Sequence, residues 1–323
     1  MLKCKFEKTI NMNNYARIPL IILLFFSTHA FSNKIDSLKT DQDVERFLKQ
    51  INKDFAKDTN FSIQTTEQLA KNLDCEGIFQ KWRMKNWEKV DITNDGLTDL
   101  VFIGSWSGYF SAAVVDNGSN NFKFYSFSKN TFENCEFVKP IRIASRNHLK
   151  IFRKTNEPDK ANNQPFQYKS LLVFDTLTFK FNDFIEFNAH EAKKDEIEAI
   201  EINTSYCFGT CPSFNLKLVK SGMAYYEGIG YTKQTGKSTK KLSPDTFNEL
   251  AALANYINIK SLKNDYAVNW TDDQTATLKI TFKDKSTKVI KDYGMQGTFG
   301  LSAIYSKMMT LGTNWPTLLN YNP

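Results

Sequence analysis

The acidic residues between Asp91 and Asp99 have the clearest capacity for chemistry in this sequence. Counted from Asp91, side-chain oxygens fall at positions 1, 3, 5 and 9 of the run DITNDGLTD, and a glycine occupies position 6. Ca²⁺ prefers oxygen ligands, and the glycine allows a sharp turn, so the spacing predicts a calcium-binding loop. The expected ligands are Asp91, Thr93, Asp95, the backbone carbonyl of Leu97, and Asp99.

This loop resembles the Asp-x-Asn-x-Asp-Gly-x-x-Asp loops of extracellular repeat and propeller proteins, with Thr93 in place of the usual Asn or Asp. It departs from an EF-hand because position 12 is Phe102, where a bidentate Glu belongs, and because strand-like sequences flank it. The alternative interpretation is that Asn94-Asp95-Gly96 forms only a turn held by local side-chain hydrogen bonds. The sequence leaves both interpretations open.

The cysteines are the second group that could do chemistry. Cys207 and Cys211 are separated by one residue too many for a thioredoxin-like redox pair, and no helix N-terminus follows to lower a thiol pKa. A structural role fits an oxidising compartment better. We expect disulfides between Cys207 and Cys211 and between Cys75 and Cys135, although the four cysteines after residue 32 allow three pairings.

Residues 1–32 predict a signal peptide. An apolar run of about nine residues follows Arg17 and is followed by small residues up to Ser32, whereas a membrane span needs about 20 apolar residues. We therefore expect a periplasmic or extracellular protein with no membrane span in the mature chain. Either Met1 or Met12 could be the true start.

The rest of the chain predicts an α+β protein with two domains, each an antiparallel sheet with helices packed on it. Residues 33–190 begin with helical periodicity over 41–57 and continue, from Trp82, as short β-rich runs that predict an antiparallel meander carrying the acidic loop. Residues 191–323 predict the order β-β-β-α-β-β-α, with Ser243 and Pro244 starting the first of the two helices.

The second domain resembles an uncharacterised family of bacterial envelope domains that is classed only as a domain of unknown function. The resemblance covers residues near 200 to 318 and depends on the entry motif Cys207-Phe-Gly-Thr-Cys211-Pro, the Gly222 hairpin and the closing Trp315-Pro316. It implies an exported protein, which agrees with the signal peptide, but it supplies no activity or catalytic residue.

Composition restricts the function classes further. The net charge is +7, but the signal segment accounts for +3, and no basic helix or arginine cluster tracks a phosphate backbone, so we expect no nucleic-acid partner. The mature chain contains only the isolated histidines His148 and His190, which supply zinc or Ser-His chemistry poorly. The most favoured function is a non-catalytic binding or structural protein with an unknown protein or polymer partner.

Two sets of residues are candidates for a functional site, one for a binding surface and one for a hydrolase. The aromatic candidates for a binding surface are Trp82, Trp87, Trp106 and Tyr109. The alternative function is a hydrolase, for which two carboxylates at suitable geometry could act as general acid and base. The dense carboxylates available for it are Asp91, Asp95, Asp99, Asp272 and Asp273.

Overall fold

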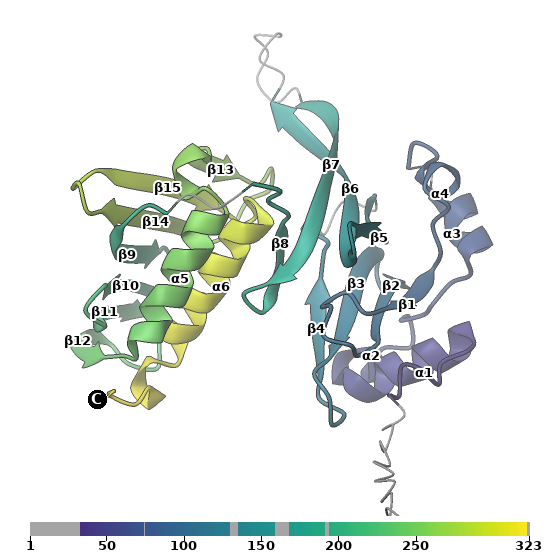
Figure 1. Cartoon of the computed structure of the whole chain (residues 1–323), viewed down its shortest axis with the longest axis horizontal. Helices are drawn as coiled ribbons and strands as arrows, with labels where there is room; N and C mark the ends of the chain where they lie inside the picture. The colour runs from purple at the N-terminus through teal and green to yellow at the C-terminus, as the bar shows by residue number, and fades with distance from the viewer. Residues whose placement is uncertain (1–32, 74, 130–134, 159–167, 191–193, 322–323) are drawn as a thin grey trace, which may run out of the picture. The chain divides into compact units, whose positions relative to one another are not determined.

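The computed structural model describes residues 33–73, 75–129, 135–158, 168–190 and 194–321, and the expected signal peptide lies outside them (Figure 1). The first region has two four-stranded sheets in which every pairing is antiparallel. The first sheet contains, in spatial order, β1 (Trp87–Val90), β2 (Asp99–Ser105), β3 (Tyr109–Asp116) and β4 (Phe122–Ser126). The second contains β5 (Glu136–Ile143), β6 (Arg146–Pro158), β7 (Tyr168–Lys180) and β8 (Asp183–Glu186).

The expected single meander is therefore two sheets, and both faces of the first sheet are covered. Leu100 and Phe102 face a core formed with the N-terminal helices, whereas Val101 and Ala113 share a second core with β5 to β8. Strands buried on both faces read as continuous apolar runs, and Leu100-Val-Phe-Ile103 is such a run. The strands β2 and β3 therefore lie between the N-terminal helices and the second sheet.

Among the described residues of this region, four helices accompany the sheets: α1 (Asp41–Ile51), α2 (Lys53–Lys57), α3 (Thr66–Asn72) and α4 (Ile78–Lys81). A capping box between Thr40 and Asp43 starts α1. The prediction of a single helix over residues 41–57 was wrong, because the segment forms two helices that are separated at Asn52. The backbone of Asn52 is extended there, and its side chain accepts a hydrogen bond from the amide of Asp54 and so caps α2.

The second region is one seven-stranded sheet with two long helices, α5 (Pro244–Tyr256) and α6 (Phe299–Thr313), on one of its faces (Figure 1). The strands are β9 (Ile197–Thr204), β10 (Ser213–Val219), β11 (Met223–Gly230), β12 (Gly236–Lys241), β13 (Asp265–Ala267), β14 (Thr275–Phe282) and β15 (Thr287–Tyr293). Their spatial order is β12-β11-β10-β9-β14-β15-β13. Short 3₁₀ helices span Ile259–Ser261 and Trp315–Thr317.

The α+β class is confirmed, and the expected strand and helix order is present with β12 and β13 added. β13 pairs with β15 in parallel, in contrast to the antiparallel pairs elsewhere in this sheet. Among the described residues, no helix is long and apolar enough to cross a membrane.

The start of α6 is held by side chains from the first region. The Glu186 carboxylate accepts hydrogen bonds from the amides of Phe299 and Gly300, at 2.5 and 2.8 Å. These amides are in the first helical turn, where no intrahelical acceptor exists and negative charge is favourable. The Lys129 ammonium donates to the carbonyl of Gly297 at 3.1 Å, and burial lowers the pKa of Lys129 to about 8. The last strand of the first region thus caps the last helix of the second.

Candidate functional site

The acidic loop connects β1 to β2 and is wound tightly around Asp91. The Asp91 carboxylate accepts hydrogen bonds from the amides of Asp95 and Gly96, each at 3.0 Å, and Asp95 accepts one from the amide of Leu97 at 2.8 Å. The hydroxyl of Thr93 lies 3.4 Å from Asp91 Oδ1. Gly96 has φ +93°, a left-handed conformation that glycine adopts without strain. The turn expected at Asn94-Asp95-Gly96 is therefore present.

Asp99 differs from the other acids of the loop because it is completely buried. Its Oδ2 accepts from the amides of Ile92 and Thr93 at 2.9 and 3.2 Å, and its Oδ1 accepts from the amide of Asp116 at 2.9 Å. Burial raises the pKa of Asp99 to about 7, although these three N–H donors act in the opposite direction. The carboxylate joins the start of β2 to the loop and to the end of β3.

The loop is also attached to Asn147, at the start of β6. Nothing in the loop sequence predicts this contact. The Asn147 side chain donates to the carbonyl of Asp91 at 2.7 Å, and its backbone exchanges hydrogen bonds with the amide side chain of Asn94 at 2.7 and 3.0 Å. Within the described ranges, no group of three or more His, Cys, Asp or Glu side chains is arranged to hold a metal ion. In this loop the carboxylates of Asp91, Asp95 and Asp99 accept hydrogen bonds from backbone N–H groups.

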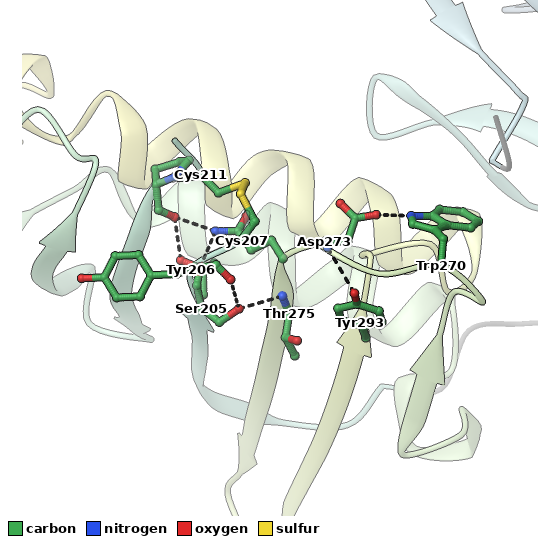
Figure 2. The surroundings of a disulfide bond; sticks show 11 residues. Ser205, Tyr206, Cys207, Cys211, Trp270, Asp273, Thr275 and Tyr293 are labelled. Carbon is green, nitrogen blue, oxygen red and sulfur yellow. Dashed lines mark hydrogen bonds between the residues drawn. A yellow bond between two sulfur atoms is a disulfide. The ribbon is translucent and has the colours of Figure 1, made fainter. Parts of the chain in front are cut away.

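The structure contains both expected disulfides, Cys75–Cys135 and Cys207–Cys211. Cys75 and Cys135 lie in a buried cluster with α3, α4 and strands of both sheets of the first region. Cys207 and Cys211 close a short loop between β9 and β10 (Figure 2).

One backbone hydrogen bond and two from the Gln274 side chain anchor the loop that Cys207 and Cys211 close. The amide of Phe208 donates to the carbonyl of Asp272, and Gln274 donates to the carbonyls of Ser205 and Pro212. Figure 2 shows the neighbouring bond from the amide of Thr275 to the Ser205 hydroxyl, at 2.9 Å. The loop itself exposes aromatic groups, because Phe208 is 88% exposed.

The remaining carboxylates named for a hydrolase, Asp272 and Asp273, make local hydrogen bonds. Asp273 accepts a hydrogen bond from the Trp270 indole, and its amide donates to the Tyr293 hydroxyl (Figure 2). Asp272 accepts from the Thr271 hydroxyl on the surface. These contacts stabilise the loop before β14.

The expected aromatic surface is also mainly structural. The indoles of Trp87 and Trp106 donate to Asp41 and Asp58, at 2.7 and 2.6 Å. Trp82 makes edge contacts with Phe152 and lies under the Lys150 ammonium at 4.4 Å. Only Trp106 among the three tryptophans is exposed, at 37%. Trp87 packs against the core under the N-terminal helices, whereas Trp82 and Tyr109 both pack against the cluster that contains Cys75 and Cys135.

The open face of the seven-stranded sheet carries a groove that the sequence analysis missed. It has a volume of about 590 Å³ and is formed by β9 to β12 on the face opposite to α5 and α6. Its floor contains an amide chain in which Asn203 donates to Asn215 at 2.6 Å and Asn215 donates to Glu227 at 3.0 Å. Tyr225, on the same face of β11 as Glu227, is 46% exposed.

The charges of this groove are balanced within it. Lys217 lies 3.7 Å from Glu201, its partner in the β9–β10 register, and Lys237 lies 3.8 Å from Glu227, its partner in the β11–β12 register. The alternation of polar and apolar residues along β9 to β12 indicates that one face of this sheet is polar. The Lys–Glu pairs could not be predicted, because they depend on the strand register, which the sequence does not specify.

Comparison with known proteins places the groove inside a recognised domain. Residues 198–312 match the family described as "Domain of unknown function (DUF6438)". No curated protein and no solved structure is similar enough to this chain to count as a match. The match agrees with the resemblance of the C-terminal half to an uncharacterised family. It includes the Cys207–Cys211 loop and every residue of the groove.

Proposed function

We propose that this chain is an exported, non-catalytic protein that binds a neutral, hydroxyl-rich polymer, such as a glycan strand, in the groove of the seven-stranded sheet. The observation that carries this proposal is the composition of the groove. Amide and hydroxyl side chains are its main hydrogen-bonding groups, because its four charged residues already form two pairs. Such groups can donate to and accept from sugar hydroxyls.

The exposed ring of Tyr225 supports the same ligand class. An aromatic side chain offers a large, rigid contact area with a polar tip, which suits a ligand with both apolar and hydroxyl-bearing faces. A polyanion or polycation would have to break the Lys–Glu pairs of the groove to gain full electrostatic contact. A neutral polymer keeps both pairs intact.

The test is a calorimetric titration with chitohexaose and maltohexaose, and with polygalacturonate as a charged polymer. We expect at least one neutral oligosaccharide to bind, and Tyr225→Ala to weaken that binding about tenfold, equivalent to about 1.4 kcal/mol. Tyr231→Ala is the matched control, because Tyr231 is also exposed but does not line the groove. Failure of both neutral oligosaccharides, or an equal loss in the two variants, contradicts the proposal.

We also propose that the acidic loop takes one Ca²⁺ with a structural role. The five expected oxygen donors suit a hard cation, and Asp91 and Asp95 lie on an exposed turn with the Thr93 hydroxyl beside Asp91. Asp99 would have to share oxygens that already accept three backbone N–H bonds. The affinity should therefore be in the weak range of extracellular modules, about 10⁻⁴ to 10⁻³ M.

Thermal unfolding tests the calcium proposal. At a calcium concentration of about 100 times the Kd, the native state should gain about 2.7 kcal/mol, and the midpoint should rise relative to a sample with chelator. Asp95→Ala should abolish the shift. The control Asp54→Ala removes a helical carboxylate that is also exposed and should keep the shift. Equal midpoints with calcium and chelator would leave the loop as a turn only.

Export is supported by the two disulfides, which are compatible with an oxidising extracellular environment. We propose cleavage near residue 32 and a periplasmic or secreted location. N-terminal sequencing of the protein from cells should give a mature chain beginning near Asn33. A chain that retains Met1 or Met12 after export would exclude this cleavage.

We propose in addition that residues 33–190 and 191–323 are two domains. The family match that begins at residue 198 supports this division. Limited proteolysis should cut first between residues 190 and 198; first cleavage elsewhere within 33–323 would argue for another boundary.

A further inference from the structure

A second cavity, separate from the groove, lies at the turn ends of two hairpins of the first region. It has a volume of about 660 Å³ and is lined by residues from the β5–β6 turn, the end of β7 and the segment after β8, with Tyr256 of α5 as one wall. Asn188 fixes that wall, because its amide and side chain donate to the hydroxyl and carbonyl of Tyr256, each at 3.0 Å.

One lining group of this cavity has a hydrogen-bonding atom without a partner. His148 is only 3% exposed, and its Nδ1 has no hydrogen-bond partner in the structure. A buried polar atom without a partner costs free energy, and native structures usually satisfy it with protein, water or ligand. The imidazole is held in place by the Phe187 ring, at 4.5 Å between ring centroids. Because Nδ1 is buried and unpaired, a molecule that reaches it would satisfy it without breaking a hydrogen bond of the protein.

Two cations, Arg146 and Lys180, give the described lining of the cavity a positive charge. Arg146, Lys180 and His190 line it together with His148, and no Asp or Glu is part of the described lining. Neither Arg146 nor Lys180 forms an ion pair within the described part of the chain. Burial and the nearby positive charge of Arg146 lower the pKa of His148. Basic groups gathered in a concavity without counter-charges favour an anion.

The walls of the cavity are aromatic. Phe179 and Phe187 line it, and the Lys180 ammonium lies 4.4 Å from the centre of the Tyr256 ring. Ligand sites combine apolar walls with a few polar groups that fix orientation, and this cavity has that arrangement. An inorganic ion would leave the aromatic walls unused.

We propose that this cavity binds a small organic anion, with its carboxylate or phosphate near Arg146, His148 and Lys180 and its flat apolar body against Phe187. His148 donates through a protonated Nδ1, and the guanidinium of Arg146 provides the paired donors that suit planar anions. The site is independent of the polymer groove, which lies on the other sheet and shares none of its lining residues.

The test is an NMR titration of ¹⁵N-histidine-labelled protein with benzoate, phenyl phosphate, inorganic phosphate and the neutral analogue benzamide. The two described histidines are His148 and His190, and His190→Asn identifies their signals. Benzoate or phenyl phosphate should shift the His148 Nδ1 resonance, with an affinity about tenfold above that of benzamide. The stronger of the two ligands identifies the head group as carboxylate or phosphate.

Two variants separate this site from general attraction of anions. Arg146→Gln should weaken binding about tenfold, whereas Arg142→Gln, on the same hairpin but outside the lining, should leave it unchanged. Both arginines are exposed, so neither change threatens folding. Equal effects of the two variants, or benzamide binding as well as benzoate, would overturn the proposal. Equal affinity for inorganic phosphate and phenyl phosphate would show that the apolar body of the ligand gains nothing from contact with Phe187.

Discussion

Replacing Asp99 with alanine should lower the free energy of unfolding by about 3 to 5 kcal/mol, among the largest effects expected of a single substitution here. The Asp99 carboxylate is completely buried and is the acceptor for the amides of Ile92, Thr93 and Asp116. Alanine leaves these donors unpaired at a site that water reaches poorly, and each buried unpaired donor costs about 1 to 3 kcal/mol. Relaxation of the loop recovers part of that sum.

Urea unfolding in the presence of a chelator measures this effect without a contribution from calcium. Asp95→Ala is the matched control, because Asp95 belongs to the same loop but is exposed and accepts one bond, from the amide of Leu97. It should cost less than about 1 kcal/mol. Asp99→Asn should fall between the two, because its amide keeps one acceptor oxygen. Equal losses for Asp99→Ala and Asp95→Ala would show that Asp99 has no special structural role.

The sequence located this loop correctly but did not specify what its carboxylates face. Ligand spacing for a cation and spacing for side-chain capping of backbone amides are nearly the same, since both place oxygens on the inside of a tight turn. The burial of Asp99 was readable in part, because it opens the apolar run from Leu100 that becomes a doubly covered strand. Its bond to Asp116 was not, because that depends on the pairing of β2 with β3.

The two cavities illustrate the same limit. Alternation along β9 to β12 predicts one polar face, but the pairing of Glu201 with Lys217 follows only from the register. The anion cavity brings together the β5–β6 turn and the end of β7, which the sequence separates by more than 30 residues. No local pattern marks Arg146 and Lys180 as neighbours. Local signals therefore indicated α1, α5, α6 and most strands, whereas both candidate cavities depend on long-range packing.

Removing the Cys75–Cys135 disulfide should destabilise the protein by about 4 kcal/mol, roughly twice the effect of removing Cys207–Cys211. The reason is the length of chain that each bond closes, which is a sequence separation of 60 residues in the first case and 4 in the second. A longer closed loop removes more conformational freedom from the unfolded chain. The first pair is also buried, with Cys75 at 1% and Cys135 at 8% exposure, so its loss disturbs a packed cluster.

The measurement compares the double variants Cys75→Ala/Cys135→Ala and Cys207→Ala/Cys211→Ala with the parent protein by urea unfolding under non-reducing conditions. Alanine avoids new buried hydroxyl groups and leaves no free thiol to exchange. Peptide mapping of the parent without reductant checks the pairing, and recovery of Cys75 joined to Cys207 would contradict it. If the short loop proved as stabilising as the long one, loop closure would not be the main source of the stabilisation. The hydrogen bonds that Gln274 makes around Cys207–Cys211 would then be the next cause to test, because they tie that loop to β14 whether or not the sulfur atoms are joined.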